Sequence, residues 1–232
     1  MKSLKVLGFL LTYPTDNHKT YAKENLRILK DEGVLSSENV TTLKTLLDWI
    51  ELTDLLDVQE EYVSLFDRTP SLSLHMFEHV HGDSRDRGQA MVDLNDLYVS
   101  KGMELSCHET PDYLPMFLEY LSTLEIDEIK KDLLDVSHVL SALEKRLENR
   151  DSLYKAVFKS IVSIVDEKVD EKKLKEVLDK SQGDAYSFEE LDKEWEEQFA
   201  FENSAQTTSQ GGCPKAEDML ARMGINDIRK GM

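Results

Sequence analysis

Apolar residues recur at helical spacing along most of the chain. The longest run steps by three and four positions, through Ile126, Ile129, Leu133, Val136, Leu140, Leu143 and Leu147. This spacing puts one apolar stripe along a helix and is typical of the seam of a packed bundle. No segment alternates apolar and polar residues with the period of two that a half-buried strand requires. The pattern predicts an all-α fold, a single-domain helical bundle.

Capping and breaking residues set the expected boundaries of the first helices. The first helix should end before Pro14. Asp16 is placed to cap a second helix, and Gly33 to stop it in a left-handed conformation. Ser36 or Ser37 can cap the third helix.

Further helices follow the same apolar spacing. A fourth is expected to carry Leu52, Leu55, Leu56, Tyr62, Val63 and Phe66. Another should run from about Ser84 to Val99, with Met91, Leu94 and Tyr98 facing inward. Pro111 is suited to begin the next helix, because proline is favoured in the first turn. After the long helix, the apolar pattern repeats once more over 153–164.

The character of the chain changes past about residue 181. Residues 187–199 are rich in carboxylates, and 202–212 form a polar stretch with little to bury. A short amphipathic segment follows Pro214. We therefore expect a helical domain over 1–181 and an acidic, flexible tail over 182–232, with a short helix after Pro214. A tail without any role is the alternative interpretation.

The charge balance narrows the classes of partner. The chain has 46 Asp+Glu against 28 Lys+Arg, a formal net charge of −18. A nucleic-acid binder needs a basic face, and an anionic membrane would repel this chain. A basic or apolar peptide fits better, although such acidity also keeps a protein soluble. No stretch approaches the roughly 18 apolar residues of a membrane span, and the run 6–11 is too short for a signal peptide. These features predict a cytoplasmic protein.

Three of the six histidines lie within seven residues: His75, His79 and His81. On a helix His75 and His79 would share a face, and Glu78 or Asp83 could complete a metal site. The segment does not match HExxH, however, and the remaining histidines are isolated in sequence. We therefore predict no bound metal. The alternative is a metal-dependent hydrolase built on the bundle from these three histidines.

Two arginines, Arg85 and Arg87, form a cationic spot on a strongly anionic chain. Their guanidinium groups could receive a carboxylate or phosphate with two parallel hydrogen bonds. In the alternative interpretation they pair internally with Asp83, Asp86 and Glu78, and so fix the start of the following helix.

Other catalytic arrangements are missing from the sequence. The chain contains no GxSxG, GxxxxGK or GxGxxG segment. Cys107 adjoins His108, but neighbours in sequence rarely form a nucleophile–base pair. With Cys213 far away, the two cysteines make neither a disulfide framework nor a CxxC site. The sequence predicts a protein that is not an enzyme.

The histidine–arginine segment resembles a known signature. Residues 77–94, FEHVHGDSRDRGQAMVDL, are similar to that of the nitrate reductase delta-chain family of NarJ-type chaperones. Upstream, 62–68 (YVSLFDR) resembles the family's tyrosine–leucine–phenylalanine motif. Downstream, 111–115 (PDYLP) and 117–121 (FLEYL) match the segment that follows. The resemblance runs from the first helix to about Leu178 and does not include the tail.

This resemblance implies both a fold and a function. The fold would be the all-helical one of TorD-like redox-enzyme chaperones. The function would be to bind the apo catalytic (alpha) subunit of respiratory nitrate reductase by its N-terminal peptide, supporting molybdenum cofactor insertion before membrane docking. No cofactor would be bound permanently, although transient contact with the molybdenum cofactor and with its biosynthesis proteins is implied. The motif residues that could contact an anion are Glu78, His79, His81, Asp83, Ser84, Arg85, Asp86 and Arg87.

A client peptide would bind as an amphipathic helix in a groove between bundle helices, with its basic residues toward an acidic rim. The expected groove positions are aromatic or flexible apolar residues near the motifs. They are Tyr62, Phe66, Phe77, Met91, Tyr98, Tyr113, Phe117 and Tyr120. Core packing is the alternative role for each of them.

Overall fold

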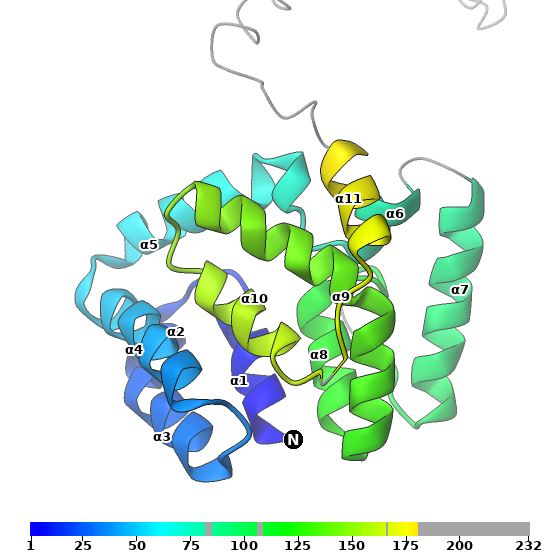
Figure 1. The fold of residues 1–232 in the computed structure, drawn as a ribbon. Helices are drawn as coiled ribbons and strands as arrows, with labels where there is room; N and C mark the ends of the chain where they lie inside the picture. Colours follow the sequence, from blue (N-terminus) through cyan, green and yellow to red (C-terminus); the bar gives the residue numbers. More distant parts are fainter. Residues whose placement is uncertain (82–84, 106–108, 166, 181–232) are drawn as a thin grey trace, which may run out of the picture. The chain divides into compact units, whose positions relative to one another are not determined.

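The computed structural model describes residues 1–81, 85–105, 109–165 and 167–180, and regular structure in these ranges is helical (Figure 1). The elements are α1 Lys2–Leu10, α2 Asp16–Thr20, α3 Ala22–Glu32, α4 Ser37–Leu52, α5 Leu55–Tyr62, the π-helix η1 Val63–Asp67, the 3-10 helix η2 Pro70–Leu72, α6 Met76–His81, α7 Arg85–Ser100, α8 Leu114–Ser122, α9 Ile126–Asn149, α10 Lys155–Val162 and α11 Glu171–Lys180. The predicted all-α fold is confirmed. The predicted tail, 182–232, lies outside the described residues, so the domain boundary at 181 stays a prediction.

The sequence predicted the ends of the first helices correctly except at the start of α2. Thr15, not Asp16, caps α2, in a capping box whose partner is His18. The predicted second helix is also interrupted at Tyr21, which separates α2 from α3. Gly33 ends α3 with a φ of 67°, the left-handed conformation in which glycine has no steric penalty. Ser36 caps α4 by accepting a hydrogen bond from the Asn39 amide at 3.2 Å.

The expected fourth helix is not continuous. Its first residue, Leu52, ends α4, and the chain turns through extended conformations at Thr53 and Asp54 before α5 begins. The turn changes the helical phase, so Leu52 and Leu56 are 83% and 73% exposed rather than inward. Five residues of π-helix then lead out of α5.

Helix α8 begins at Leu114, not at Pro111. The residues before it are held outside the helix. The Tyr113 amide closes a turn on the Thr110 carbonyl, the Met76 amide donates to the Asp112 carbonyl, and the Leu114 amide donates to the Leu74 carbonyl. Pro115 therefore occupies the first turn that had been expected for Pro111. The preceding helix, α7, matches its predicted span, and Tyr98 faces inward and is buried.

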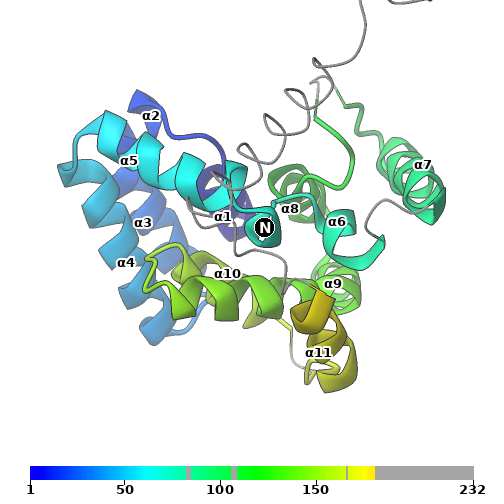
Figure 2. The same cartoon turned by 90° about the horizontal axis from the view of Figure 1, so that it is seen from above.

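The core forms around α1, which packs against α3, α8 and α10 (Figure 2). Gly8 makes the α1–α8 approach close. A Cβ there would lie 3.2 Å from the Pro115 carbonyl oxygen and 3.3 Å from Leu118 Cβ. Along α9, the predicted apolar stripe is buried except for Ile126 and Val136. Helix α9 packs mainly against α10 and α11.

Helix α11 was not predicted, yet Leu174 and Val177 bury one of its faces. Among the described residues, no helix has the length and apolar character needed to cross a membrane.

Candidate functional site

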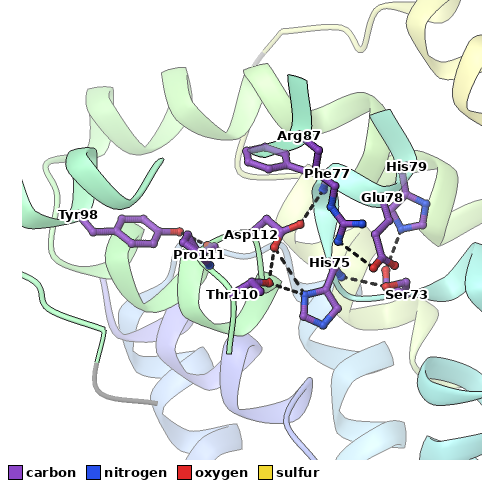
Figure 3. A network of polar contacts seen from close by, with 10 residues as sticks. All are labelled: Ser73, His75, Phe77, Glu78, His79, Arg87, Tyr98, Thr110, Pro111 and Asp112. Carbon is purple, nitrogen blue, oxygen red and sulfur yellow. Dashed lines mark hydrogen bonds and ion pairs between the residues drawn. The ribbon is translucent and has the colours of Figure 1, made fainter. Parts of the chain in front are cut away.

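The histidine-rich segment forms a short helix, α6, docked on the loop before α8 (Figure 3). An isolated antiparallel bridge pairs His75 with Tyr113. Their rings also lie 5.4 Å apart. Backbone hydrogen bonds thereby join residues 74–76, directly before the family-like segment 77–94, to residues 112–114 of the family-like segment 111–115.

The Asp112 side chain is the centre of this junction. It is fully buried, and its Oδ2 accepts a hydrogen bond from the Phe77 amide in the first turn of α6, at 3.1 Å. Its Oδ1 accepts from the Thr110 hydroxyl at 2.5 Å and lies 3.6 Å from His75 Nδ1. A carboxylate at a helix N-terminus satisfies an otherwise free amide and complements the helix dipole. Asp112 is therefore a cap for α6 supplied from another part of the chain.

The same contacts shift the pKa values of Asp112 and His75. Burial by itself raises the pKa of Asp112, but contacts from His75, the Thr110 hydroxyl and the Phe77 amide outweigh it and lower that pKa below its ordinary value. The neighbouring Asp112 carboxylate raises the pKa of His75 above its ordinary value, against the opposing effect of burial. The geometry favours an imidazolium–carboxylate pair.

His79 and Arg146 form a second polar cluster. The buried His79 ring places Nε2 at 2.8 Å from the Ser73 carbonyl oxygen, to which it can donate. Arg146 of α9 donates to the Ser71 and Val177 carbonyls, at 2.7 Å each, and its Nη1 lies 3.5 Å from His79 Nδ1. Arg146 thus links α9 with η2 and α11. Arg146 was not among the residues predicted from the sequence, although an arginine next to Leu147 at the edge of an apolar stripe was a signal for it.

The three histidines do not converge on one point. His75 faces Thr110 and Asp112, His79 faces the Ser73 carbonyl, and the His81 ring contacts Phe77 edge-on at 5.6 Å. Within the described ranges, no group of three or more His, Cys, Asp or Glu side chains is placed to hold a metal ion. The metal-dependent hydrolase interpretation finds no support in this part of the chain.

The arginine pair is described only in part. Arg87 Nη2 donates to Glu78 Oε1 at 2.9 Å, which favours the internal pairing that joins α6 to α7. Asp86 is exposed at the start of α7. Asp83, Ser84 and the Arg85 side chain lie outside the described residues, so anion contact by this motif stays a prediction.

The expected groove residues divide into two groups. Five are buried in the core: Tyr62, Phe66, Tyr98, Phe117 and Tyr120. The Tyr62 and Tyr98 hydroxyls donate to the carbonyls of Leu11 and Pro111, each at 2.8 Å. Only Phe77, Met91 and Tyr113 are half-buried. Peptide contact stays a prediction for all eight, and it is sterically simplest for these last three.

One of these three lines a hollow of about 300 Å³ between α1, α8 and the loop before α8. Its lining residues are Lys5, Gly8, Phe9, Thr12, Glu109, Tyr113, Pro115, Met116 and Glu119. Most are apolar or lack a charge, and two glutamates lie at the rim. The single cation, Lys5, is 3.9 Å from Glu119. The close α1–α8 contact at Gly8 forms part of this hollow.

Comparison with known proteins places the chain in a family. A profile of the nitrate reductase delta subunit family matches residues 34–160. The chain is 37% identical to the nitrate reductase molybdenum cofactor assembly chaperone NarJ of Escherichia coli K12, over 85% of this chain and 84% of NarJ. It is 35% identical to NarW of the same organism, named a probable chaperone of that kind, over 85% of this chain and 82% of NarW. A Bacillus subtilis protein, named a probable NarJ, is 25% identical over 66% of this chain. The chain belongs to the nitrate reductase delta subunit family.

Proposed function

We propose that this chain is a cytoplasmic chaperone for the assembly of a respiratory nitrate reductase. It binds the apo catalytic subunit through that subunit's N-terminal peptide. It keeps the subunit competent for molybdenum cofactor insertion and delays membrane docking until insertion is complete.

Family membership is the observation that carries the proposal. The matches to NarJ and NarW extend over 85% of this chain and more than four fifths of each relative. The names of both relatives refer to molybdenum cofactor assembly. The polar clusters around Asp112 and Arg146 are compatible with the same proposal, because the hydrogen bonds of these side chains cap and join helices.

The hollow beside α1 and α8 is the binding surface that we propose for the peptide. An amphipathic helix could place apolar side chains against Phe9, Pro115 and Met116. Lysine or arginine residues of the peptide would then face the carboxylates of Glu109 and Glu119. Attraction between exposed charges is screened within about 10 Å at 0.1 M salt, so this binding should weaken as salt rises.

Cofactor handling is a separate part of the proposal. The chain would retain no cofactor and would touch the molybdenum cofactor, or the proteins that deliver it, only while the subunit is bound. Arg85 is the residue of the motif that we propose for such an anion contact, since Arg87 already pairs with Glu78.

Titration calorimetry with the N-terminal peptide of the catalytic subunit tests the binding step. We expect the double variant Glu109→Gln with Glu119→Gln to bind several-fold more weakly at low salt and to show a smaller salt dependence. The matched control is Glu171→Gln with Glu176→Gln on α11, two exposed carboxylates that should leave binding unchanged. Absence of binding by the unmodified protein would contradict the proposed function. An unaltered salt dependence in the rim variant would contradict only the proposed location.

A further inference from the structure

Two leucines at the corner between α4 and α5 are the most exposed large apolar residues in the described chain. Leu52, the last residue of α4, is 83% exposed, and Leu56, in the first turn of α5, is 73% exposed. Single exposed leucines are common on protein surfaces and need no explanation. Here, however, two largely exposed leucines lie on either side of one turn, the residues Thr53 and Asp54 that separate α4 from α5. We call Leu52 and Leu56 the corner leucines.

The corner leucines are held outward by fixed backbone. The Asp54 carboxylate accepts a hydrogen bond from the Leu56 amide at 2.9 Å and caps α5. On the other side of the turn, Lys19 Nζ donates to the Thr53 carbonyl oxygen at 2.5 Å. The opposite face of α5 carries the buried Val58 and Tyr62. Because α5 is anchored on that face, Leu56 is not free to turn into the core.

The surroundings of the corner leucines are strongly acidic. No lysine or arginine occurs between Asp54 and Asp67. Asp57, Glu60 and Glu61 are exposed on α5 and form no ion pair within the described part of the chain. The acidic residues of α4 differ, since Asp48 pairs with Lys44 and Glu51 pairs with Lys23. The carboxylates of Asp57, Glu60 and Glu61 are therefore not paired with a cation in the described chain, and the one ammonium at the corner, that of Lys19, is engaged by the Thr53 carbonyl.

We infer that the corner leucines and the acidic face of α5 form a docking surface for a cationic, amphipathic protein segment. Apolar side chains of that segment would cover Leu52 and Leu56, and its lysines or arginines would face Asp57, Glu60 and Glu61. A second copy of this chain fits poorly, because each copy carries a formal charge of −18. An anionic lipid surface is disfavoured for the same reason. The inference does not depend on the proposed function, and the surface shares no residue with the hollow beside α1 and α8.

The test uses a synthetic amphipathic helix built from leucine and lysine, with methyl-labelled protein observed by NMR. We expect the Leu52 and Leu56 methyl signals to shift on titration. The variant Leu52→Gln with Leu56→Gln should bind the peptide about tenfold more weakly, because it removes apolar contact and leaves every charge in place. A peptide with glutamate in place of lysine should not bind.

The control variant is Val92→Gln with Val99→Gln, which removes two exposed valines from α7, each 53% exposed. It should bind like the unmodified protein, and thermal melting should show that both variants are folded. Equal binding by the leucine variant would overturn the inference and indicate charge attraction alone. Shifts confined to Met116 of the hollow would also overturn it, since the peptide would then occupy the other surface.

Discussion

The Asp112 carboxylate lies 3.6 Å from His75 Nδ1 and also accepts a hydrogen bond from the first turn of α6. Asp112 belongs to the family-like segment 111–115, and His75 lies two residues before the family-like segment 77–94. Their contact joins α6 to the loop before α8, and that loop includes Tyr113, which lines the hollow proposed for the client peptide. The contact between His75 and Asp112 thus fixes a loop of the surface that we propose for the client peptide.

Replacing the buried carboxylate should destabilise the protein. Asp112→Asn removes the charge that Thr110, His75 and the Phe77 amide satisfy, and one amide group cannot reproduce all three contacts. We expect the free energy of unfolding to fall by about 1–3 kcal/mol in denaturant titrations. Asp135→Asn, at an exposed position of α9, is the matched control and should change it by less than about 0.5 kcal/mol. Equal effects of the two changes would contradict the capping role.

The His75–Asp112 pair should also make stability depend on pH. The pKa of His75 is raised above its ordinary value of 6.5 in the folded state. Its contribution is therefore fully present below pH 6.5 and is lost as the pH rises through the raised pKa. Asp112 has a lowered pKa, so its own contribution is lost only as the pH falls below the ordinary value of 3.8.

The variant His75→Gln isolates this effect. We expect the unmodified protein to exceed the variant in unfolding free energy by more at about pH 5.5 than at about pH 8.5. The quantity to measure is the difference in unfolding free energy between the two proteins at each pH. Buried His18 has a lowered pKa, so it changes stability with pH in the opposite direction, but its effect is the same in both proteins and cancels in this difference. A difference that grows toward high pH would show that the pair does not carry charge as described.

Arg146 should hold α11 in place. Arg146→Met removes the hydrogen bonds to the Ser71 and Val177 carbonyls, so we expect a loss of about 2–3 kcal/mol in unfolding free energy. Hydrogen exchange should accelerate most in α11. Arg150→Met, which removes a more exposed contact at 3.2 Å to the Thr69 hydroxyl, is the control and should leave α11 protected. Unchanged exchange in the Arg146 variant would contradict the linking role.

The sequence was sufficient for features that depend on local pattern. The 3-4 spacing over 126–147 predicted α9, and Gly33 predicted the left-handed end of α3. Capping predictions were right where the side chain acts on its own helix, as at Ser36, and failed by one residue at Asp16.

Features that depend on contacts between distant segments could not be predicted from the local sequence pattern. Helix α8 starts late because its preceding residues pair with 74–76, and nothing local to Pro111 reports that pairing. Leu52 and Leu56 fit an apolar spacing, yet a turn between them changes their direction. Asp112 caps a helix that begins 36 residues earlier in the chain, at Met76, so its role appears only in three dimensions.

The central claim is that this chain supports molybdenum cofactor insertion into a nitrate reductase. The direct measurement is the molybdenum content of the catalytic subunit, purified from cells that do or do not produce this chain. We predict a subunit with close to one molybdenum per chain when the chaperone is present, and a largely molybdenum-free subunit when it is absent. Equal molybdenum content in the two preparations would contradict the proposed function.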